Sequence, residues 1–113
     1  MPLPPPVEFG FEPIDDEGAA WRKDLAVGPI VFRLLRTMEQ LGPAEAIQRE
    51  VFGAEDIDIA GATQLVILHE TGGDVIGAIR ERDGEEELVG LSIGWGGYHH
   101  RVPLLVSDML AVR

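Results

Sequence analysis

The sequence contains no cysteine among its 113 residues. Disulfide frameworks and thiolate metal sites are therefore excluded, and no residue pattern indicates an oxidising compartment. Basic residues are also scarce, because nine Lys and Arg stand against twenty Asp and Glu and leave a formal charge of −11. Phosphate backbones and anionic membranes repel such a chain, so we expect neither nucleic acid nor a membrane as a partner.

Long apolar runs are absent too. No run approaches the roughly 18 residues of a membrane-spanning helix, and the N-terminus lacks the basic and apolar regions of a secretion signal. We therefore expect a cytoplasmic protein. A hydrophobic content of 45% in 113 residues is typical of one globular domain. Because so small a domain buries only about 60–70% of its surface on folding, assembly with a second chain would add to its stability.

Prolines and acidic residues dominate the beginning of the chain. Six of the eight prolines fall within residues 1–29, together with the acidic run Asp15, Asp16 and Glu17. This composition predicts an extended, proline-rich acidic arm outside the core. The apolar aromatic residues of the arm are expected to pack onto the domain or onto a second copy; they are Phe9, Phe11 and Trp21.

Residues 30–113 carry the hydrophobic periodicity of an α+β domain. A strand is expected from Ile30 to Arg36, followed by a helix with Pro43 in its first position and a second helix with Asp58 as N-cap. Gly-containing polar connections then separate three strands, 74–80, 87–95 and about 104–112. The sequence thus predicts two helices on a mainly antiparallel sheet of about four strands. The expected core comprises Phe32, Leu34, Ile47, Val51, Leu65, Ile76, Ile79, Val89, Leu91 and Leu110.

Four local strings carry a family likeness when they are taken in order. They are IQREVFG at 47–53, GGDVIGA at 72–78, LVGLSIG at 88–94 and MLAVR at 109–113. Together they resemble the N-terminal half of the GNAT N-acyltransferases, in a branch often associated with N-acylation of amino acids, over residues 31–113. The resemblance implies transfer of an acyl group from a coenzyme A thioester to a primary amine.

The resemblance also implies where the cofactor would lie. In the family the fourth strand presents backbone groups to the pantetheine arm of acetyl-CoA or another acyl-CoA, which points to Met109, Leu110, Ala111 and Val112. The competing interpretation treats these as ordinary strand residues. Family members continue into a glycine-rich loop that opens a helix and holds the pyrophosphate, and the 113 residues contain no such loop. We therefore expect a half-domain that is inactive alone, binds acyl-CoA weakly or not at all, and is either a fragment or completed by a second chain.

Two carboxylates are candidates for the base that deprotonates an incoming amine. These are Asp108 and Glu70, since N-acyl transfer requires a neutral amine. Asp108 stands where this branch more often has a histidine, which separates it from the family pattern. For Glu70 the alternative is a surface charge at a helix end.

The remaining polar and aromatic candidates favour structural roles. His99 and His100 are adjacent and diverge in direction, with no third ligand, so no metal site is expected. His69 lies on an apolar helix face and is interpreted as a hydrogen-bonded core residue. Trp95 and Tyr98 either pack in the sheet or line an acceptor pocket.

A second interpretation makes the chain a non-catalytic dimerisation or binding domain derived from the GNAT fold. Its fourth strand would end the sheet as an apolar edge, and long apolar edges pair readily with another chain. A two-fold homodimer through this edge is therefore expected, and the N-terminal arm could wrap the partner copy.

Overall fold

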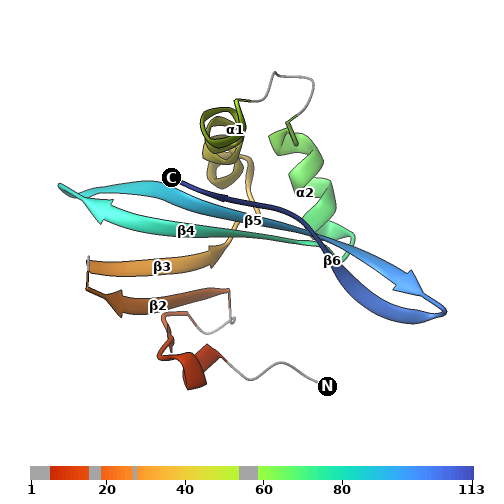
Figure 1. The fold of residues 1–113 in the computed structure, drawn as a ribbon, viewed down its shortest axis with the longest axis horizontal. Helices are drawn as coiled ribbons and strands as arrows, with labels where there is room; N and C mark the ends of the chain where they lie inside the picture. The colour runs from red at the N-terminus through yellow and green to blue at the C-terminus, as the bar shows by residue number, and fades with distance from the viewer. Residues whose placement is uncertain (1–5, 16–18, 27, 54–58) are drawn as a thin grey trace.

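A computed structural model describes residues 6–15, 19–26, 28–53 and 59–113 of the chain. Six antiparallel strands form one sheet in which spatial order follows chain order, and two helices connect the third strand to the fourth (Figure 1). The elements are a short 3-10 helix Pro6–Phe9, β1 Glu12–Pro13, β2 Ala20–Leu25, β3 Gly28–Leu34, α1 Met38–Phe52, α2 Ala62–Glu70, β4 Asp74–Arg82, β5 Glu85–His99 and β6 Val102–Val112.

The predicted α+β class, with two helices on a mainly antiparallel sheet, is confirmed, but the expected four strands are two too few. The two additional strands come from residues 1–29, which were expected to lie outside the core. There β2 pairs with β3 from Ala20↔Arg33 to Leu25↔Gly28, and Ala20 is buried. Aromatic packing holds the segment before β2 as well, because the ring of Phe11 meets that of Phe32 edge-on at 5.1 Å.

Helix α1 begins five residues before the predicted start at Pro43. Thr37 and Gln40 form a capping box: the Gln40 N–H donates to Thr37 Oγ1 at 3.2 Å, and the Thr37 N–H donates to Gln40 Oε1 at 3.3 Å. This reciprocal cap satisfies donors that the first turn would otherwise leave free. Pro43 consequently lies inside the helix, and Gly53 ends it in the left-handed conformation.

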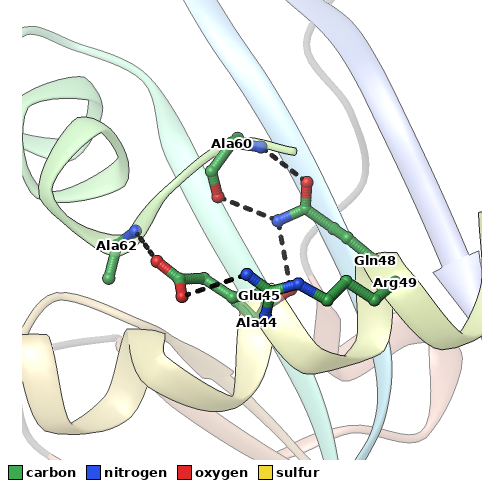
Figure 2. A network of polar contacts seen from close by, with 6 residues as sticks. All are labelled: Ala44, Glu45, Gln48, Arg49, Ala60 and Ala62. Carbon is green, nitrogen blue, oxygen red and sulfur yellow. Dashed lines mark hydrogen bonds and ion pairs between the residues drawn. The ribbon is translucent and has the colours of Figure 1, made fainter. Parts of the chain in front are cut away.

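Polar side chains of α1 hold the start of α2 (Figure 2). Gly61 has no side chain to cap α2, and Glu45 supplies the acceptor instead: the Ala62 N–H donates to Glu45 Oε1 at 2.8 Å. The fully buried Gln48 accepts from the Ala60 N–H at 2.8 Å and donates to the Ala60 carbonyl at 3.0 Å. The predicted N-cap, Asp58, lies outside the described residues.

Two tight hairpins join the last three strands, all of which are longer than predicted. The first turn is Asp83-Gly84, with φ of 53° and 80°, and residues of this type favour positive φ. The second is His100-Arg101, with φ of 48° and 68°. The expected loop at 96–101 is therefore only a two-residue turn, because Gly96 to His99 continue the ladder of β5 with β6.

Cross-strand pairing divides the sheet into two faces, since directly opposite residues point to the same side. Both helices pack on one of them, the helix face, which carries rows such as Gly77–Leu91–Ala111. The other, the open face, carries the rows Leu34–Ile76–Ser92–Leu110 and Phe32–Ala78–Gly90–Val112.

Core predictions succeed on the helix face, where Ile47, Leu65, Ile79 and Leu91 are buried. They fail for Ile76 and Leu110, which are exposed because they belong to the open face. Val51 is also exposed, since the buried stripe of α1 follows Leu41, Ala44, Ile47 and Gln48. The remaining three, Phe32, Leu34 and Val89, are half-buried.

The molecule is flat, with extents of 44 × 38 × 22 Å. The β5–β6 hairpin extends beyond the rest of the sheet (Figure 1). Its end has no third strand beside it, because β4 pairs with β5 only as far as Asp74↔Gly94. We call this two-stranded part, residues 95–106, the hairpin arm. None of the helices among the described residues is long and apolar enough to cross a membrane.

Candidate functional site at the edge of the sheet

Strand β6 is an edge strand whose backbone groups alternate between its neighbour and the outside. The Arg113 N–H donates to the Val89 carbonyl at 2.9 Å, so residues 113, 111 and 109 bond to β5. Residues Leu110 and Val112 then point their N–H and C=O groups away from β5. No other strand among the described residues pairs with this side of β6.

The four residues expected at the cofactor site lie in this strand but differ in environment. Ala111 is 1% exposed on the helix face, and Met109 packs half-buried against the same core. Leu110 and Val112 are 70% and 65% exposed on the open face. The outward-directed backbone groups and the exposed side chains therefore belong to the same two residues.

Asp108 lies in a β-bulge at the middle of β6. Met109 pairs with Ile93 and Ser107 with Gly94, which leaves Asp108 without an opposite residue. The Trp95 indole Nε1–H donates to Asp108 Oδ2 at 2.9 Å, and Trp95 itself packs against the hydrophobic core. A carboxylate that accepts only this bond within the described residues keeps acceptor capacity for another donor.

Ion pairs anchor the end of β6 next to the outward-facing groups. Arg113 Nε lies 2.7 Å from Glu50 Oε2 on α1, and its Nη1 lies 3.5 Å from Glu87 Oε1 on β5. The other Glu87 oxygen accepts from Arg80 Nη2 at 3.1 Å. This hydrogen bond, reinforced by the charges of Arg80, Arg82 and Arg113, holds the pKa of the Glu87 carboxyl below its ordinary value of 4.5.

The other predicted candidates lie away from the Asp108–Val112 part of β6. Glu70 is the exposed last residue of α2. His69 precedes it half-buried, and its Nδ1 is buried without a hydrogen-bond partner in the described structure, so the expected core hydrogen bond is not present at that atom. His99 and His100 are exposed at the tip of the hairpin arm, with ring centroids 4.2 Å apart. Among the described residues no group of three potential ligands could hold a metal ion.

Sequence reasoning did not find the Trp95–Asp108 bond or the Arg113 anchor. Trp95 is paired with Val106, and its indole reaches diagonally along β6 to Asp108, a contact that depends on the register of the hairpin. No protein-family model matches the chain, and searches of curated proteins and of solved structures found no match.

Proposed function

We propose that this domain is the N-terminal half of a GNAT-type N-acyltransferase in which the free edge of β6 receives the pantetheine arm of an acyl-CoA. The observation that carries the proposal is the pair of outward-directed backbone groups at Leu110 and Val112. A pantetheine arm contains two amides, and an extended amide chain pairs with a sheet edge as an added strand does. The four family strings support the same assignment.

The bulged carboxylate supplies the acid–base chemistry in this proposal. Asp108 first takes one proton from the ammonium, and the Trp95 indole fixes the orientation of the carboxylate by its bond to Oδ2. The neutral amine nitrogen then attacks the thioester carbonyl, a C–N bond forms and the C–S bond breaks. The nitrogen's second proton goes to the departing sulfur, so coenzyme A leaves as the thiol. Glu70 has no role in this scheme, because it lies at the exposed end of α2.

The described part of the chain offers no equivalent site for the phosphates of the cofactor. Neither α1 nor α2 begins with a glycine-rich phosphate loop, and the charge of −11 repels the anionic groups. Binding should therefore come from the pantetheine arm alone. The pyrophosphate then has to be held by polypeptide other than these 113 residues, so the chain by itself is expected to be inactive.

Calorimetry tests the assignment with two thioesters. S-acetylpantetheine, which lacks the phosphates, should bind the 113-residue chain at least as well as acetyl-CoA, and both should bind weakly. Leu110→Pro removes one outward N–H from an edge strand and should abolish binding, whereas Leu110→Ala keeps the N–H and should bind normally. Micromolar binding of acetyl-CoA would contradict the account of the phosphates, and equal binding by both variants would contradict the role of the edge.

A non-catalytic assembly domain is a second candidate, and a specific observation favours it. The sequence of β6 is a nearly continuous apolar run, typical of a strand covered on both faces, yet its open-face side chains are exposed. A second copy pairing along β6 around a two-fold axis would satisfy the outward backbone groups and bury part of these side chains against those of the partner strand.

Light scattering at micromolar concentration separates the two candidates. An assembly domain should be a dimer that Val106→Lys converts to monomer or to insoluble protein, and S-acetylpantetheine should not dissociate it. A stable monomer that binds S-acetylpantetheine leaves only the acyltransferase proposal.

A further inference from the structure

A second site lies on the helix face, apart from the edge of β6. It is a pocket of about 490 Å³ between the start of α1 and strands β3, β4 and β5, which we call the α1 pocket. Its volume falls within the range of small-ligand sites, roughly 300–1,000 Å³. Its lining combines a buried apolar floor with a charged rim.

The floor consists of three side chains from three neighbouring segments. Leu35, Ile79 and Leu88 line the pocket although each is at most 9% exposed. They lie deep because Gly77 occupies the middle of β4 beneath them: a Cβ there would stand 2.8 Å from Leu88 Cδ1 and 3.0 Å from Leu35 Cδ1. The missing side chain lets the two leucines close over the strand, which keeps the floor apolar and recessed.

The rim presents mainly hydrogen-bond acceptors. Glu39 and Glu86 supply two exposed carboxylates, and Arg33 is the single cation among the residues that line the pocket. Arg33 already faces a carboxylate, since its Nη1 lies 3.4 Å from Glu86 Oε2. The rim therefore keeps a net negative charge.

The proline inside α1 adds a backbone acceptor on the same side. Pro43 has no N–H, so the carbonyl of Glu39, four residues earlier, receives no hydrogen bond from it. Pro43 and Glu39 both line the pocket. The unusual place of this proline, well inside the helix, thus leaves an accepting carbonyl next to an accepting carboxylate.

We propose that the α1 pocket binds a small amphipathic primary amine, with its apolar body on the Leu35–Ile79–Leu88 floor and its ammonium group at the Glu39 and Glu86 rim. An ammonium has three donors and no acceptor, which matches a rim of carboxylates beside a backbone carbonyl that Pro43 cannot bond. The net charge of −11 favours a cation over an anion. The inference does not depend on acyl transfer at β6, because binding is measured without any thioester.

Three ligands of equal length test the charge requirement: hexylamine, hexanol and hexanoate. Titration is followed by NMR on the methyl groups of Leu35, Ile79 and Leu88, with the exposed methyls of Ile67 on α2 as a reference. Hexylamine should shift the floor methyls and bind roughly fivefold tighter than hexanol, with hexanoate weakest. Equal binding of all three ligands, or floor methyls that do not move, would overturn the proposal.

Charge variants locate the ammonium group. Glu39→Gln should weaken hexylamine binding roughly threefold and leave hexanol unchanged, whereas Glu85→Gln, in the same hairpin as Glu86 but outside the pocket lining, should alter neither. Arg33→Gln should tighten hexylamine binding, because Glu86 loses its present cation. A loss of affinity in Glu85→Gln equal to that in Glu39→Gln, or weaker hexylamine binding in Arg33→Gln, would refute the assignment.

Discussion

Adjacent residues of β6 show how much the two faces of the sheet differ in solvent exposure. Ala111 points to the helix face and is 1% exposed, whereas Leu110, one residue earlier, points to the open face and is 70% exposed. Both are apolar. Ala111 lies opposite the apolar Leu91, whereas Leu110 lies opposite Ser92, with the apolar Ile76 next in the same row. The strands therefore have apolar side chains on both faces of the sheet, as strands covered on both sides do. In the described structure, however, only the helix face is fully covered.

The largest expected effect comes from the same substitution on the two faces. Leu91→Ala should lower the free energy of unfolding by about 2–5 kcal/mol, because it leaves a cavity under the helices. Leu110→Ala should change it by less than about 0.5 kcal/mol, since its side chain already meets solvent. Urea denaturation at low protein concentration makes the comparison. Similar losses in both variants would mean that the open face is covered in solution.

Loss of the hydrogen bonds between Gln48 of α1 and Ala60, just before α2, should have the next largest effect on stability. Gln48→Ala leaves the half-buried N–H and C=O of Ala60 without their side-chain partner and should cost about 1–3 kcal/mol. Gln64→Ala, at an exposed position of α2, is the matched control and should be nearly neutral. Urea denaturation of the two variants checks the prediction. Equal free energies of unfolding would show that the hydrogen bonds between Gln48 and Ala60 contribute little to stability.

The smallest expected effect is electrostatic and lies at the anchored end of β6. The folded pKa of Glu87 is lowered below 4.5, so its ion pairs stabilise the fold above that pH and this contribution is lost as the pH falls through the lowered pKa. Glu87→Gln should therefore lose less stability than the unmodified protein on acidification below about pH 4.5. Exposure of the pair to solvent keeps the difference small. Melting curves across this range test it, with Glu85→Gln as control; a steeper acid loss in Glu87→Gln would contradict the sign.

Local signals predicted the elements that depend on local chemistry. The Gly-containing turn at Asp83-Gly84 and the two apolar strands that it joins appear as expected. Prediction failed in two places for different reasons. At the start of α1 two local signals competed, and the capping box of Thr37 and Gln40 prevailed over Pro43. In residues 1–29 the prolines and acidic residues indicate an extended arm, but pairing with β3 makes part of the segment a strand of the sheet.

The candidate site was predictable as a strand at the edge of the sheet, but the difference between its two sides was not. Residues 109–112 were placed together in the sequence, yet their alternation between faces depends on the register with β5. That register contains a bulge at Asp108, which no residue pattern indicated. Leu110 was wrongly expected in the core for the same reason: its apolar character suggests burial, but the register with β5 places it on the exposed open face.

The most direct test of the central claim is an amide NMR titration of the 113-residue chain with S-acetylpantetheine. The outward N–H groups of Leu110 and Val112 should shift on addition of the ligand, while the N–H groups of Met109 and Ala111, which bond to β5, should stay close to their starting positions. Equal shifts along the strand, or no shift at Leu110 and Val112 at saturating ligand, would contradict the proposal that the free edge of β6 receives the pantetheine arm.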